Sequence, residues 1–168
     1  MEQIIDKKPD LKDSILFFLK KNKLKIYILA SIIFTLILIF LVLSENKKNE
    51  NIFISENYVK AGLLVSSGQK DEAKKFYENI IMSDNKFYSL LSLNTVLEKN
   101  LIEDSEKILE YFAQLEKKNF SEDLKDLILF KKALYLIKIK DPESGKKILE
   151  NLIKNDSTLK LPAQEIIK

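Results

Sequence analysis

The residue types that carry most enzyme chemistry are missing from this chain of 168 residues. It has no histidine and no cysteine, which excludes an imidazole base, a thiol nucleophile, a disulfide and a zinc site built on those side chains. Serine–lysine or carboxylate chemistry remains formally open. However, the acidic residues Glu103, Asp104 and Glu106 are typical of a helix start, and no glycine-rich phosphate loop is present. We therefore predict that the protein is not an enzyme and uses no cofactor, no metal and no small-molecule substrate.

The charges are divided unequally along the chain. All 28 basic residues are lysine, against 25 acidic residues. Residues 1–25 hold seven lysines and four acids, whereas residues 26–168 hold 21 of each and carry no net charge. Without a net positive field, this larger part does not attract nucleic acid. We predict no nucleic-acid partner.

An uncharged apolar segment runs from Ile26 to Leu43 without a glycine or proline. As a helix it would span roughly 27 Å, close to the bilayer core of about 30 Å. We predict a transmembrane helix over 26–44 and the lipid bilayer as a partner. A buried core helix and a cleaved signal peptide are the alternatives. The segment is longer than the usual signal h-region of about 7–15 residues, and no A-x-A-like site follows it.

Lysines on the two sides of this segment predict its direction. Three lysines follow it within residues 44–60, whereas seven precede it, namely Lys7, Lys8, Lys12, Lys20, Lys21, Lys23 and Lys25. Because positive charge beside a membrane span stays in the cytoplasm, we expect residues 1–25 to be a basic cytoplasmic tail and residues 45–168 to lie outside. Helical spacing within the tail indicates either a short helix on the inner leaflet or, as we favour, a solvated tail; the residues are Leu11, Ile15, Phe18 and Leu19.

Beyond a linker over 45–53, the chain reads as a series of helices over 54–168. Apolar residues recur there every three or four positions, and no strand-like alternation of useful length occurs. Stop and cap residues such as Gly68, Asn100 and Asp141 separate the segments. The expected helices cover 54–67, 71–82, 86–99, 103–118, 122–140 and 142–155, with a final stub from Pro162.

A pattern of small residues repeats along these helices. Gly68, Ala73 and Tyr77 resemble the second half of a tetratricopeptide repeat (TPR), and Ala61 stands where that motif wants a small residue in its first helix. The pattern recurs at Asn100, Ser105 and Leu109, and again at Lys140, Gly145 and Leu149, with Ala133 as the counterpart of Ala61. Leu93 departs from the pattern in the middle unit. Small residues at these places let two helices pack closely.

We therefore predict an all-α protein: one N-terminal transmembrane helix, then a short TPR-like α-solenoid of about three helical hairpins. The residues expected to set the packing of the repeats are Ala61, Gly68, Ala73, Ala133 and Gly145. A generic α-bundle with chance spacing is the alternative.

The layout as a whole resembles the YfgM-like family, the ancillary subunit of the bacterial SecYEG translocon. The resemblance rests on Tyr58-x-x-Ala61, on Gly68 followed by Ala73 after the anchor, and on an ending helix with Ala163-Gln164-Glu165. It implies a single-pass protein of the bacterial inner membrane with a periplasmic TPR-like domain. The implied partners are the SecYEG translocon and a membrane-anchored periplasmic chaperone. A TPR adaptor in cell-envelope assembly or division is the alternative function.

In this frame the concave face of the hairpins carries mostly apolar residues. These predicted groove residues are Tyr58, Gly62, Val65, Phe87, Leu90, Asn94, Leu97, Leu127, Phe130, Leu134 and Ile137. A clamp for a charged peptide tail needs lysine, arginine and asparagine, and only Asn94 fits. An apolar groove suits a partner helix or a non-native segment. The alternative is that bundle closure or the C-terminal helix covers these residues as core.

Overall fold

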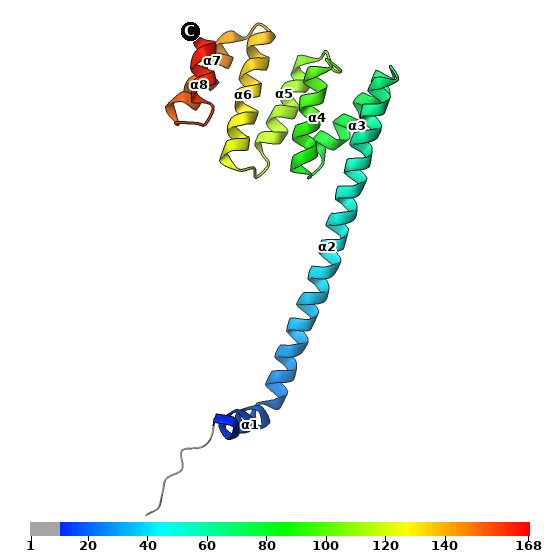
Figure 1. Cartoon of the computed structure of the whole chain (residues 1–168), viewed down its shortest axis with the longest axis vertical. Coiled ribbons are helices and arrows are strands. Elements are labelled where there is room, and N and C mark those ends of the chain that lie inside the picture. The colour runs from blue at the N-terminus through cyan, green and yellow to red at the C-terminus, as the bar shows by residue number, and fades with distance from the viewer. Residues whose placement is uncertain (1–10) are drawn as a thin grey trace, which may run out of the picture. The chain divides into compact units, whose positions relative to one another are not determined.

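The computed structural model describes residues 11–168, and every regular element within that range is a helix. This confirms the expected all-α fold for the described residues. The helices are α1 (Leu11–Lys21), α2 (Lys23–Ser66), α3 (Lys70–Met82), α4 (Lys86–Glu98), α5 (Ser105–Glu116), α6 (Glu122–Lys138), α7 (Pro142–Lys154) and α8 (Lys160–Ile167) (Figure 1).

The chain divides into two compact units, Met1–Asn49 and Glu50–Lys168. The boundary falls within the expected linker over 45–53, but these residues are helical and belong to α2. The physical reason is local: residues 44–53 include neither glycine nor proline, and lysine and glutamate are good helix formers. The change from apolar to polar residues at this point therefore does not end the helix.

The first unit contains α1 and the apolar part of α2. Within the described residues, α2 is the one helix long and apolar enough to cross a membrane. Its most apolar window has a mean hydropathy of 3.0, and no residue in that window is buried. The predicted span over 26–44 lies wholly within α2. Only Asn22 separates α1 from α2, and residues 11–21 form the short helix that their spacing indicated.

Three helix starts of the second unit, those of α4, α5 and α7, are capped by short polar side chains. Asp104 Oδ1 accepts hydrogen bonds from the N–H groups of Glu106 and Lys107 at 3.0 and 3.2 Å. Asp141 caps α7 by accepting from Ser144 N–H, with proline at the first helical position, as the sequence predicts. Ser121 precedes α6 but makes no side-chain capping bond.

Four helices end with one residue in the left-handed region of backbone conformation. These residues are Gly68, Asn100, Lys140 and Asp156, with φ values of 81°, 46°, 69° and 54°. The next N–H then bonds back over the last turn: Gln69 donates to Leu64 O and Asp141 donates to Leu136 O, both at 2.9 Å. This is the Schellman arrangement. The repeat pattern in the sequence includes the first three of these ends, and the fourth lies directly after the predicted helix over 142–155.

The small residues of the repeat pattern are buried where helices meet. Ala61, Ala73 and Ala133 have no exposed surface. A Cβ atom added to Gly145 would lie 2.7 Å from the backbone oxygen of Ala133, so α6 and α7 approach each other closely at this point. Gly68 differs from them, because it is exposed and acts through its backbone conformation.

The core of the second unit consists of two clusters. The first has fourteen buried residues from α2 to α6, centred on large side chains such as Tyr77, Phe112 and Leu115. The second has four buried residues in α6, α7 and α8: Ala133, Leu149, Leu152 and Ala163. Helices that follow one another along the chain from α3 to α8 pack together (Figure 1).

Lys118, just after α5, holds the turn between α3 and α4. Its Nζ donates to Ile81 O at 3.0 Å, to Ser89 Oγ at 2.7 Å and to Ser83 O. The three ammonium hydrogens therefore have three acceptors. Burial lowers the pKa of Lys118 from its ordinary value, and the nearby Asp84 carboxylate acts in the opposite direction. The contact ties three helices together at one point.

Candidate partner-binding groove

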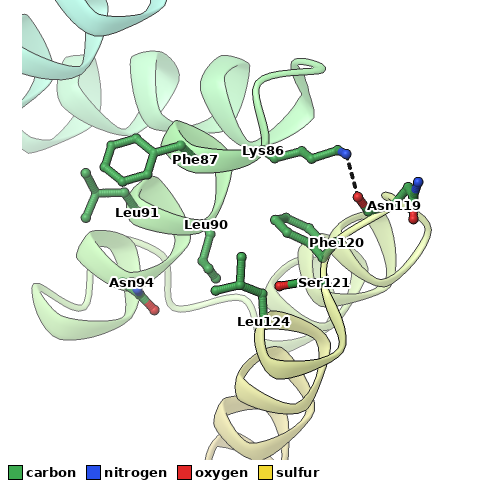
Figure 2. A pocket seen from close by; sticks show the side chains of 9 residues that line it. All are labelled: Lys86, Phe87, Leu90, Leu91, Asn94, Asn119, Phe120, Ser121 and Leu124. Atoms are coloured by element: carbon green, nitrogen blue, oxygen red, sulfur yellow. Dashed lines mark hydrogen bonds between the residues drawn. The ribbon is translucent and has the colours of Figure 1, made fainter.

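An open apolar pocket lies between α4 and the start of α6, with a cavity volume of about 440 Å³. We call it the α4–α6 pocket. It is lined by Lys86, Phe87, Leu90, Leu91, Asn94, Asn119, Phe120, Ser121 and Leu124 (Figure 2). Five of these residues come from α4, and the other four come from the segment that leads into α6 and from its first turn.

The α4 wall brings together three of the predicted groove residues. Phe87, Leu90 and Asn94 lie three and four residues apart, so one face of α4 presents all three. Phe87 is the most exposed of them, at 68%. Leu90 is half-buried and packs against the first core cluster. The pocket therefore has a floor that packs on the core and an exposed aromatic ring at its edge.

The opposite wall was not foreseen from the sequence. Phe120 is buried in the first core cluster, and its ring faces the pocket beside Leu124, which is partly exposed (Figure 2). The repeat frame placed the third hairpin's groove residues from Leu127 onward, one turn too late. The available signal was the spacing itself, since Leu124 precedes Leu127 by three residues and continues the same helical face.

The polar groups of the pocket are few. Lys86 is the one charged residue among those that line it, and its Nζ donates to the backbone oxygen of Asn119. Asn94 Oδ1 is buried and has no hydrogen-bond donor within the described part of the chain. An unpaired buried acceptor costs about 1–3 kcal/mol.

Other predicted groove residues lie outside the pocket and join the helices to one another. The hydroxyl of Tyr58 shares a hydrogen bond with Thr95 Oγ1 at 3.0 Å, and the Tyr58 ring lies 5.6 Å from the Tyr77 ring. Val65 and Leu97 are half-buried against the same first cluster. These three side chains attach α2 and α4 to the core, so they contribute packing and not an open surface.

The predicted groove residues of α6 also lie apart from the pocket. Phe130 and Ile137 are half-buried and pack against the second core cluster. Leu134 is 39% exposed. Gly62 and Leu127 are half-buried. The structure therefore places the predicted set in three locations: the pocket, the packing around Tyr58, and the packing around Phe130.

The chemistry of the α4–α6 pocket favours an apolar side chain over a charged or strongly polar ligand. Eight of its nine lining residues carry no charge, and five of them are phenylalanine or leucine. Its volume lies in the range of about 300–1,000 Å³ that is usual for binding pockets. No family model, no curated protein and no solved structure matches this chain.

Proposed function

We propose that this chain is a non-catalytic protein-interaction module, anchored in the bacterial inner membrane, that assists the Sec translocon and periplasmic chaperones. The observation that carries the proposal is the α4–α6 pocket: an apolar site with an exposed phenylalanine, on a helical unit that follows a membrane-length apolar helix. A site of this kind recognises apolar side chains of another protein.

The anchor is supported by the apolar part of α2, none of which is buried by the protein itself. A core helix of a soluble protein would be mostly buried. The seven lysines before the span and the three within residues 44–60 support an N-terminus in the cytoplasm and a periplasmic second unit.

The TPR-like solenoid is supported by two recurring features of the second unit. One is the left-handed helix end at Gly68, Asn100 and Lys140. The other is close helix contact at small residues, of which Gly145 against Ala133 is the tightest. A solenoid of this type presents its first helices on one concave face, and α4 and α6 would be two of those helices.

The translocon and the membrane-anchored chaperone enter the proposal through the resemblance to the YfgM-like family. The apolar character of the pocket fits this role, because translocating chains and membrane partners expose apolar segments. The nearly complete absence of charge in the pocket speaks against a clamp for charged peptide tails. The one charged group of the pocket, the Lys86 ammonium, donates a hydrogen bond to the backbone oxygen of Asn119.

The first test replaces Phe87 with serine in the full-length protein. Phe87 is exposed, so Phe87→Ser should change the free energy of unfolding by less than about 0.5 kcal/mol. It should weaken partner binding by about 1–2 kcal/mol, which is five- to thirtyfold. The measurement is recovery of translocon subunits with the detergent-solubilised protein. Leu161→Ser is the matched control, since Leu161 is 71% exposed but lies in α8, away from the pocket.

Unchanged recovery of translocon subunits with Phe87→Ser would contradict the role of the pocket. Recovery of cell-envelope assembly or division proteins in place of translocon subunits would favour the alternative function.

The second test concerns the direction of the anchor. A reporter that is active only in the periplasm should be active when it is fused after Lys60 and silent when it is fused at Lys8. The reason is the lysine asymmetry across the apolar segment. The reverse pattern would place the second unit in the cytoplasm and exclude periplasmic partners.

A further inference from the structure

Among the side chains of α1 that the structure describes, the apolar ones are exposed. Ile15, Phe18 and Leu19 lie three or four residues apart, so they share one face of the helix. All three are exposed, Phe18 to 61%. Phe17 is exposed too, but it lies about 100° around the helix from Phe18 and is not part of this face.

Lysines accompany this apolar face. Residues 11–25 contain one acid, Asp13, and five lysines, namely Lys12, Lys20, Lys21, Lys23 and Lys25. A basic helix with one apolar face is typical of segments that lie on a membrane surface. The excess of positive charge is complementary to anionic lipid headgroups.

The position of α1 in the chain places it near the lipid headgroups when α2 spans a bilayer. It ends at Lys21, five residues before the apolar segment begins at Ile26. Five helical residues rise about 7.5 Å, which is close to the thickness of about 5–8 Å for one headgroup layer. Both α1 and the start of α2 belong to the same unit. Once α2 spans a bilayer, the end of α1 is held at the headgroup layer by the chain itself.

We infer that α1 is an interfacial helix that binds a bilayer surface carrying anionic lipid. Ile15, Phe18 and Leu19 enter the boundary of the acyl chains, and the lysines contact anionic headgroups. This inference rests on the membrane anchor of the proposed function. It does not depend on the direction of the anchor or on the protein partners.

The test uses the full-length protein in nanodiscs of phosphatidylcholine, alone or mixed with phosphatidylglycerol. Because the chain has no cysteine, a single introduced cysteine can carry a polarity-sensitive fluorophore. Phe18→Cys labels the apolar face. Lys20→Cys is the matched control, two residues away and about 160° around the helix. Ile33→Cys labels the apolar part of α2.

In the mixed nanodiscs, the probe at position 18 should lie in lipid and be quenched by a lipid-borne quencher, and the probe at position 20 should face water. Replacing Lys20 and Lys21 with glutamine in the Phe18→Cys protein should lower the ratio of lipid-bound to water-exposed probe by roughly fivefold for each lysine. That change should occur in the mixed discs and be small in phosphatidylcholine alone. Raising the salt concentration should act in the same direction.

Equal exposure to water of the probes at positions 18 and 20 in mixed discs would overturn the inference and leave α1 as a solvated helix. A lipid-bound fraction that responds neither to lipid charge nor to the lysine replacements would overturn the anionic-lipid partner. Exposure of the Ile33 probe to water would overturn the anchor together with the inference, so the two failures are distinguishable.

Discussion

The backbone oxygen of Ala133 leaves no room for a side chain on Gly145. In most helices, replacing glycine with alanine stabilises the protein, by up to about 1 kcal/mol. At Gly145 the added Cβ would meet Ala133 O at 2.7 Å and Ile137 Cγ1 at the same distance. We expect Gly145→Ala to lower the free energy of unfolding by about 1–3 kcal/mol, because α6 and α7 must move apart.

The measurement is urea unfolding of the fragment 50–168, with Lys146→Ala as the control. Lys146 is the next residue of α7 and is exposed, so its replacement should change stability by less than about 0.5 kcal/mol. If Gly145→Ala stabilises the fragment, the close approach of the two helices is wrong.

Single residues that act through their size were predictable from the sequence. Ala61 and Ala73 are separated by the same 12 residues as Ala133 and Gly145, and all four are buried. Their spacing indicates where the two helices of one hairpin contact each other, and this contact depends on that hairpin alone. The position of Phe120 and Leu124 in the pocket depends on how the next hairpin packs, and no sequence pattern within one hairpin indicates that.

The helices themselves were predicted within a few residues at most boundaries, because caps and stops are local signals. Asp104 and Asp141 make the capping bonds that their positions suggest. Asp156 follows α7 with positive φ, directly after the helix that the sequence predicts over 142–155. The expected linker over 45–53 contains the boundary between the two units, but its residues are helical, because nothing in its polar composition stops a helix.

Lys118 is the contact between elements whose loss should be most visible. Lys118→Met keeps the length and the apolar stem but removes the ammonium that serves Ile81 O, Ser83 O and Ser89 Oγ. A hydrogen bond to a charged group contributes about 1.5–3 kcal/mol. Because Lys118 is only half-buried, we expect a loss of about 1–2 kcal/mol.

Thermal unfolding of the fragment 50–168 checks this expectation, with the neighbouring exposed Lys117→Met as the control. Equal melting temperatures for the two variants would show that the Lys118 contacts do not contribute to stability.

At the scale of the whole molecule, the all-α fold and the apolar helix followed from composition and periodicity. The absence of strands within residues 11–168 and the unburied span of α2 agree with both. The location of the pocket did not follow, because it requires α4 and α6 to be placed relative to each other. Residues such as Tyr58 and Phe130 looked equivalent to Phe87 in the sequence, and only packing separates them.

The division of the core into two clusters has a consequence for how the second unit opens. The second cluster has four buried residues, whereas the first has fourteen. The C-terminal end of the unit should therefore have the lower local stability, and local unfolding should begin at α7 and α8. Amide hydrogen exchange should therefore be faster in α7 and α8 than in α3 and α5. Uniform protection would contradict this. Since the pocket is built from α4, Phe120 and Leu124, the C-terminal helices can fray while the partner site keeps its shape.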